Sequence, residues 1–282
     1  MDFSEEKTVV EMIRDKYDQI FMAEKKVADF VLENPERTVN ANVSELANLS
    51  GVSDATVIRF CKRIGFQGHY QFRITLSRDL GRIMEGYSRQ QDNGEDQTVA
   101  GTFQDYGRKI TAIGKHISDE TMKQCVELIK SANYVHVVAA GNTTHLARYM
   151  GFRLGRLGIR CTYNELPEYF LNHINLAEPG DIVFAISESG SSKQVIQALE
   201  LARDKGLKTI AVTGYEYSPM TKLADCLLLS VFEEQSFDYY KTYSHLKEIA
   251  VLDAVLTFLS REDGISQTVA NKAEMILSET KI

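Results

Sequence analysis

The sequence has few cysteines and no pattern that would join them. Its four cysteines, Cys61, Cys125, Cys161 and Cys226, lie far apart, and no two of them form a C-x-x-C pair. A structural zinc site or a disulfide framework needs cysteines at defined short spacings. We therefore expect reduced, mostly buried thiols in a cytoplasmic protein that holds neither a metal ion nor another cofactor.

Long apolar stretches are also missing. No run of 18 apolar residues occurs, and the N-terminal residues MDFSEEK are acidic rather than basic. A membrane-spanning helix needs about 20 apolar residues, and a secretory signal starts with basic residues before an apolar region. The sequence therefore predicts no membrane partner and no secretory signal. With 282 residues, 44% of them hydrophobic, the chain is long enough for two globular domains.

Positive charge is scarce overall, since the formal net charge is −7, but it is unevenly distributed. Residues 1–54 hold 12 acidic and 6 basic side chains, whereas residues 55–90 hold 7 basic and 2 acidic ones. The seven cations are Arg59, Lys62, Arg63, Arg73, Arg78, Arg82 and Arg89. Such a segment is what neutralisation of DNA phosphates requires. Taken alone, it would equally fit a solvated helical face.

The basic segment coincides with a pattern of two short helices around a glycine. Ala47 is small enough for a close helix crossing, and Gly51 can adopt the positive φ of a tight turn. Ser53 can cap the second helix, whose apolar residues Val57 and Phe60 turn inward. The residues expected to contact DNA are Ser53, Thr56, Arg59, Lys62 and Arg63. The pattern predicts a helix-turn-helix that reads double-stranded DNA.

Composition also divides the chain into parts. Residues 5–80 are predicted to be almost entirely helical, because their apolar positions recur at helical spacing. Residues 86–101 are polar and aperiodic. We predict a helix-turn-helix domain at residues 1–85, a linker at 86–104 and a second domain at 105–282.

Short apolar strands alternate with helices in the second domain. Strands are expected at residues 134–140, 159–163, 181–187, 208–213 and 226–231, with helices at 144–157, 193–205, 241–259 and 266–278. Such alternation predicts right-handed βαβ crossovers. The fold class is therefore an all-α helix-turn-helix domain joined to an α/β domain, in which helices flank a five-stranded parallel sheet.

Two glycine-containing loops follow strands of this sheet, and each precedes a helix. They consist of Gly141, Asn142, Thr143 and Thr144, and of Ser187, Glu188, Ser189, Gly190, Ser191 and Ser192. Ligands of open parallel sheets bind at the carboxyl ends of the strands, where helix N-termini offer N–H donors. Neither loop contains lysine, so amides, hydroxyls and helix dipoles suit a single phosphomonoester better than a magnesium nucleotide. Ordinary turns are the alternative interpretation.

Both halves of the chain resemble one family. Residues 137–149, 181–213 and 218–220 resemble the sugar isomerase (SIS) domain of phosphosugar-binding proteins, with the S-x-S-G-x-S loop at 187–192. The segments VADFVLENPE from Val27 and VSDATVIRFCKRIGFQGHYQFR from Val52 resemble the N-terminal domain of RpiR/MurR transcriptional regulators. The resemblance implies a regulator whose operator binding responds to a sugar phosphate, with no catalytic residues. It implies that Thr143, Thr144, Ser187, Ser189, Ser191 and Ser192 hold the phosphosugar.

The sequence departs from this family at two points. Gly-Asn-Thr-Thr stands where G-x-G-S is commoner, and Ser244-His245 replaces the usual Ser-Arg. The identity of the sugar is therefore left open. Since one reader helix makes too few contacts for an operator, we also expect a homodimer or homotetramer on a palindromic site.

Two other functions remain as alternatives. A phosphosugar isomerase or lyase needs a general base, for which the candidates are Glu165, Glu188, Glu248, His145, His173 and His245. Each has a plainer structural explanation, and no spacing among them demands catalysis. A dinucleotide sensor is less well supported, because residues 141–146 lack the second and third glycines of G-x-G-x-x-G.

Overall fold

The computed structural model describes residues 7–88, 98–231, 244–262, 275–276 and 278. Up to residue 231, the described chain divides into two compact units between Asp105 and Tyr106. None of the helices in these ranges is long and apolar enough to cross a membrane.

The first unit is helical, as predicted. Its helices are α1 (Val9–Lys16), α2 (Met22–Glu33), α3 (Pro35–Asn40), α4 (Val43–Leu49), α5 (Asp54–Ile64) and α6 (His69–Ser88), with a 3₁₀ turn η1 (Tyr17–Gln19) after α1. Side-chain caps determine where several of these helices begin. Thr8 with Glu11 and Asn42 with Glu45 form capping boxes at α1 and α4. Buried apolar side chains from the helices then form one core, which includes Val27, Leu46, Val57, Phe60 and Phe72.

The second unit contains, among its described residues, five strands in one parallel sheet. They are β1 (Val135–Ala139), β2 (Cys161–Tyr163), β3 (Ile182–Ile186), β4 (Lys208–Thr213) and β5 (Cys226–Leu229), in the order β2-β1-β3-β4-β5. The division between the units falls within α7 (Val99–Ile113). The helices that follow are α8 (Asp119–Ser131), α9 (Thr144–Arg156), α10 (Pro167–Asn175), α11 (Lys193–Asp204) and α13 (Leu246–Ser260), with 3₁₀ turns η2 (Gly141–Thr143) and η3 (Thr221–Leu223).

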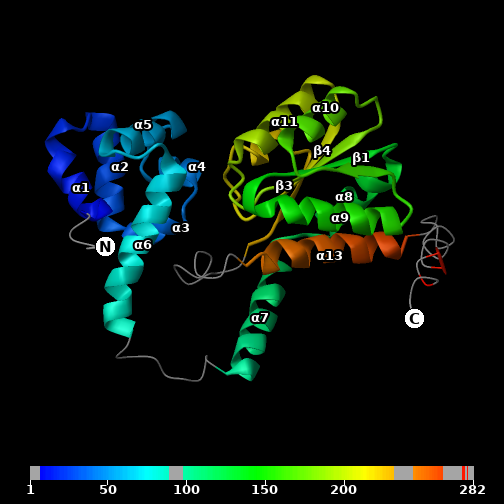
Figure 1. Cartoon of the computed structure of the whole chain (residues 1–282), viewed down its shortest axis with the longest axis horizontal. Helices are drawn as coiled ribbons and strands as arrows, with labels where there is room; N and C mark the ends of the chain where they lie inside the picture. Colours follow the sequence, from blue (N-terminus) through cyan, green and yellow to red (C-terminus); the bar gives the residue numbers. More distant parts are fainter. Residues whose placement is uncertain (1–6, 89–97, 232–243, 263–274, 277, 279–282) are drawn as a thin grey trace. The chain divides into compact units, whose positions relative to one another are not determined.

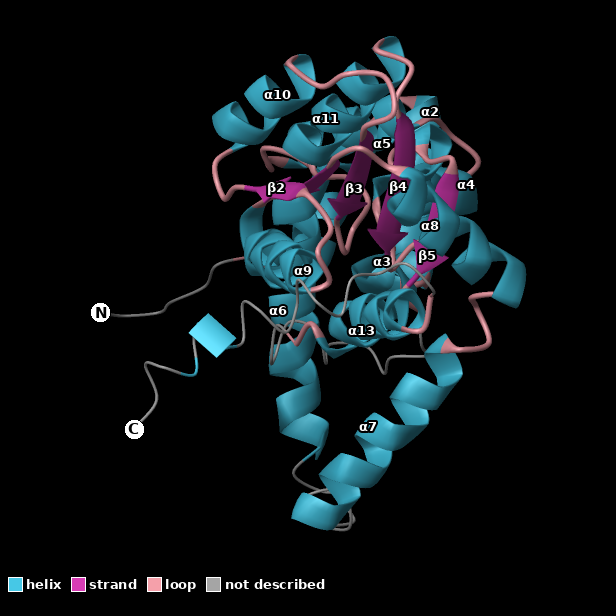
Figure 2. Cartoon of the chain, turned by 90° about the vertical axis from the view of Figure 1, so that its right-hand side faces the viewer, coloured by secondary structure: helices cyan, strands magenta, loops and turns pink. Residues whose placement is uncertain are grey.

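Helices cover both faces of this sheet. Figures 1 and 2 show α10 and α11 on one face and α8, α9 and α13 on the other. Each face has its own apolar core, because β1 and β3 are buried along their whole length. The predicted fold class is confirmed.

Some helix limits differ from the prediction. α6 continues to Ser88 and α7 begins at Val99, so both enter the range 86–104 that was predicted as a linker. Polar helical turns lack the apolar periodicity on which the prediction relied. The last strand is shorter than expected, and α10 was not predicted. Of the predicted helices at 241–259 and 266–278, residues 241–243 and most of the second lie outside the described residues.

The order of the strands defines one special point at the carboxyl edge of the sheet. β1 lies between β2 and β3, with Ala139 paired with Ile186. The chain leaves β1 toward β2 on one side and later returns to β3 on the other. Ligands of doubly wound sheets bind where the strand order reverses in this way. The two predicted loops follow β1 and β3, the strands that flank this point.

Candidate functional site

The loop after β1 is fixed to the end of β3. Gly141 has φ +64°, which turns the chain into η2. The hydroxyl of Thr143 donates to the carbonyl oxygens of Ala140 at 3.1 Å and of Ile186 at 3.4 Å. Thr143 is therefore buried and shapes the loop, while Gly141 and Asn142 are exposed and Thr144 is half-buried.

The loop after β3 is close-packed and centred on Gly190. This residue has φ +61°, and a Cβ there would lie 2.2 Å from Ser218 Oγ and 3.0 Å from Thr213 Oγ1. The N–H of Ser191 donates to Ser189 Oγ at 3.3 Å, and the Ser191 hydroxyl donates to the Ser189 carbonyl at 3.2 Å. The loop is held in one shape by these contacts.

The start of a helix lies beyond each loop. Thr143 precedes α9 and Ser192 precedes α11, and neither forms a side-chain cap. The first N–H groups of a helix have no acceptor inside the helix and carry partial positive charge. The N-termini of α9 and α11 therefore follow adjacent strands, an arrangement that favours the binding of an anion.

The predicted site residues divide by exposure. Ser189, Ser191 and Ser192 are half-buried, as is Thr144, whereas Ser187, Glu188 and Gly190 are buried. The N–H of Ser187 donates to the carbonyl of Val212 at 3.0 Å. Ser187 is buried because it continues the line of β3 into the interior. Thr143 is also buried.

A buried lysine beside the second loop was missed by the sequence analysis. Lys247, in the first turn of α13, lies with its Nζ 3.3 Å from Glu188 Oε1, and both side chains are at most 8% exposed. No cation was predicted near the loops, because the prediction used only the residues within the two loops. The second loop thus lies against a buried ion pair, in addition to its own amide and hydroxyl donors.

Three further titratable residues lie on this side of the sheet. Glu248 is fully buried, and its Oε2 is 3.5 Å from His245 Nδ1. The His145 ring lies 4.8 Å from that of His245. Burial, and then the charge of His245, lower the pKa of His145. The structure therefore brings three of the six general-base candidates together, Glu248, His145 and His245, while Glu188 is linked to the same end of α13 through Lys247.

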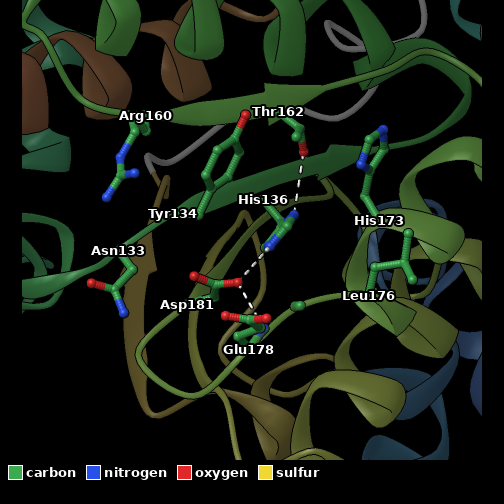
Figure 3. Close-up of a pocket in the computed structure, with 10 residues that line it drawn as sticks. Asn133, Tyr134, His136, Arg160, Thr162, His173, Leu176, Glu178 and Asp181 are labelled. Carbon is green, nitrogen blue, oxygen red and sulfur yellow. Dashed lines mark hydrogen bonds and ion pairs between the residues drawn. The ribbon is translucent and has the colours of Figure 1, made fainter.

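The other two candidates lie apart from this group. Glu165 is 59% exposed and pairs with Arg148 at 3.8 Å. His173 lines a separate pocket of 340 Å³ at the amino ends of β1, β2 and β3 (Figure 3). His136 also lines this pocket, and its ring nitrogens lie 3.5 Å from Asp181 Oδ2 and 3.3 Å from Thr162 Oγ1. These polar groups satisfy one another, which gives them a structural role.

No group of three or more metal-ligating side chains lies close enough to hold a metal ion within the described ranges.

In the first unit, α5 has the predicted inner and outer faces. The Ser53 hydroxyl accepts from the Thr56 N–H at 3.3 Å and caps the helix. Val57, Phe60 and Ile64 are buried, whereas Lys62 is exposed and the Arg59 side chain is 60% exposed.

One predicted contact residue, Thr56, is buried rather than exposed. Thr56 is only 5% exposed, and its hydroxyl accepts from Arg59 Nη2 at 3.0 Å. Thr56 lies at the border between the two faces, where packing against the rest of the unit covers it. It can orient Arg59 but does not itself face outward.

Arg63 is held by a residue that the sequence analysis did not single out. Its Nε lies 2.5 Å from Oε2 of Glu24, a residue of α2 with only 2% exposure. Its guanidinium also stacks on the Phe21 ring at 4.2 Å. Arg63 therefore joins α5 to α2, and Arg59, whose Nε is 3.9 Å from Glu24 Oε1, lies beside it.

The remaining cations of the basic segment differ in position. Arg73 is 3% exposed, with Nη1 3.5 Å from the Ala41 carbonyl, so it belongs to the interior. Arg78 is 47% exposed in its side chain. The side chain of Arg82 and the whole of Arg89 lie outside what the structure describes. The cations exposed on α5 are thus Arg59 and Lys62, with Arg63 partly exposed.

Comparison with known proteins matches both units. Residues 7–82 match the helix-turn-helix domain of the rpiR family, and residues 128–258 match the SIS domain. The chain belongs to the RpiR family of transcriptional regulators. An HTH-type transcriptional regulator from Caldanaerobacter subterraneus is 28% identical over 97% of this chain and 98% of its own length. HexR, an HTH-type transcriptional regulator from Pseudomonas aeruginosa, is 24% identical over 92% of this chain and 91% of its own.

A solved relative has the same fold over nearly the whole chain. The NanR protein of Vibrio vulnificus, in complex with ManNAc-6P, has a TM-score of 0.82 and 23% identity, covering 98% of this chain and all of NanR. Together, the two domain matches and the full-length relatives identify this chain as a helix-turn-helix transcriptional regulator with an SIS domain. The full-length relatives favour a regulator over an isomerase or lyase, and the SIS match favours a phosphosugar domain over a dinucleotide sensor.

Proposed function

We propose that this RpiR-family regulator binds operator DNA through the outward face of α5 and a sugar phosphate at the loops after β1 and β3. The ligand would bind one arrangement of the two domains better than the other and so change the fraction of protein that can bind DNA. Residues 86–104 would connect the two domains. We expect a cytoplasmic homodimer or homotetramer, because two reader helices are needed for a palindromic operator.

The proposal of a sugar-phosphate ligand is supported by the N-termini of α9 and α11, which have no side-chain cap and lie beside the two glycine-containing loops. Amides at the starts of α9 and α11, together with hydroxyls of Thr144, Ser189, Ser191 and Ser192, suit a phosphoryl group. The buried ion pair of Lys247 and Glu188 would hold the second loop in position from inside the domain. NanR was solved with ManNAc-6P, so phosphorylated amino sugars belong in the first panel of candidate ligands.

The test is a thermal-shift screen of the full chain against hexose phosphates and phosphorylated amino sugars. A ligand at 100 times its dissociation constant stabilises the folded state by about 2.7 kcal/mol. The proposal requires a phosphorylated sugar to raise Tm while its unphosphorylated form does not. Interconversion of the sugar phosphate during incubation would instead support the isomerase alternative.

Ser189→Glu is expected to abolish the response to a sugar phosphate identified in this way. A carboxylate in the second loop would repel the phosphoryl group. Thermal shift with and without ligand measures the effect, and Ser189→Ala should reduce the response less. Ser260→Glu adds the same charge at the exposed far end of α13 and should leave the response intact. An unchanged ligand affinity in Ser189→Glu would remove this loop from the proposed site.

Arg59→Ala is expected to weaken operator binding by about 10-fold to 100-fold, as loss of a base or phosphate contact costs roughly 1–3 kcal/mol. Fluorescence anisotropy with labelled duplex measures this loss. Arg37→Ala removes the same charge from an exposed position on α3 and serves as the control. The ligand-induced Tm shift should survive in both variants. Equal DNA affinities of the two variants would contradict the assignment of α5 as the reader.

A further inference from the structure

The outward face of α5 has two chemically different sides. Arg59, with Arg63 beside it, lies toward α2, where Glu24 holds both guanidinium groups. Ile58 lies on the other side and is 38% exposed. Between them, Ala55 and Lys62 are also exposed. The face therefore carries cations along one side and an apolar side chain along the other.

Ile58 is not an outlying member of the core. The inner face of α5 consists of Val57, Phe60, Cys61 and Ile64, all of which are fully buried. At 100° per residue, Ile58 points well away from this face. A single exposed apolar side chain is ordinary on a protein surface. Here, however, a β-branched residue with weak helix propensity lies along one side of the proposed reading face, where an exposed lysine, glutamine or glutamate would favour the helix more.

The major groove offers one apolar group to such a side chain. Thymine carries a C5 methyl group there, whereas adenine, guanine and cytosine present hydrogen-bonding atoms. Arginine is the usual partner of guanine O6 and N7. With Arg59 and Ile58 adjacent on one helix, the face combines a donor for guanine or phosphate with an apolar contact for thymine.

We infer that Ile58 reads the methyl group of a thymine in each operator half-site. The inference rests on the proposed function, since it requires α5 to lie in the major groove. It adds a specificity-determining residue and a feature of the DNA sequence that this residue selects.

The test uses a duplex selected from a random-sequence library by the full-length protein. Each thymine is then replaced in turn by deoxyuridine, which keeps the base pair and removes only the methyl group. We expect one position per half-site at which the replacement lowers affinity about fourfold, the value of one buried methyl group. In Ile58→Ala the same replacement should have no further effect, and Ile58→Val should retain most of it.

The Ile58→Ala variant should fold normally, because the Ile58 side chain lies outside the core. An unchanged Tm of Ile58→Ala checks this point. If the selected duplex binds but no thymine is sensitive, or if the sensitivity persists in Ile58→Ala, the inference is wrong while the proposed function stands. Failure to select any duplex would overturn both.

Discussion

Replacing Lys247 with methionine is expected to lower the free energy of unfolding of the SIS domain by about 3–5 kcal/mol. Lys247 Nζ lies 3.3 Å from Glu188 Oε1, and neither side chain is more than 8% exposed. Without the ammonium, the Glu188 carboxylate would remain buried with its cation removed. Such a charge costs far more than the net value of the pair. Thermal or denaturant unfolding of the full chain measures the loss.

Two further variants separate this explanation from a loss of packing. The double variant Glu188→Gln with Lys247→Met removes both charges and should regain most of the lost stability. Arg153→Met breaks an exposed pair with Asp253, whose side chains are 44% and 47% exposed, and should cost less than about 1 kcal/mol. If the double variant is no more stable than Lys247→Met alone, the buried pair is not the cause.

Gly190→Ala is expected to destabilise the SIS domain by about 3 kcal/mol and to remove the response to the sugar phosphate. The added Cβ would lie 2.2 Å from Ser218 Oγ and 2.6 Å from Ser218 Cβ. Ser218 is fully buried and accepts a hydrogen bond from the Thr221 N–H, so it has little room to move. The positive φ adds backbone strain to this overpacking. The loop, and the N–H groups that follow it, would therefore shift.

Gly141→Ala is the matched control. Gly141 has nearly the same φ, +64°, but nothing lies within 4 Å of the added Cβ. Backbone strain alone should cost roughly 1–2 kcal/mol. A difference of about 1–2 kcal/mol corresponds to roughly 2–8 °C in Tm for a domain of this size. Equal melting temperatures for the two variants would show that the second loop is less tightly packed than described.

Much of the α/β fold was predictable from the sequence because buried parallel strands are continuous apolar runs. The runs at 134–140 and 181–187 have no polar alternation, and each is followed by glycine and small hydroxyl residues. The crossover rules predict the order of the strands only in part. The order matters because the two loops are neighbours only if β1 and β3 are adjacent. The helix-turn-helix was predictable because Gly51 and Ser53 have local roles that do not depend on distant contacts.

The remaining site residues depend on contacts between distant parts of the chain. Glu24 meets Arg63 across 39 residues, and Lys247 meets Glu188 across 59. Neither partner forms a recognisable spacing in the sequence. Thr56 was misplaced for a related reason, because helical periodicity locates the centre of a face better than its border. Such borders are decided by the neighbouring helices, which for α5 include α4 and α2.

The ion pair of Arg63 with Glu24 also has a consequence for which residues of α5 can be substituted during evolution. The inner face of α5 packs in the core and one flank is tied to α2 by the Arg63–Glu24 ion pair, while Ala55, Ile58 and Lys62 project from exposed positions. Substitutions at these three sites are therefore nearly neutral for folding. On the proposed function, exchange of these few surface side chains would change the DNA sequence that is recognised and would leave the interior of the domain intact.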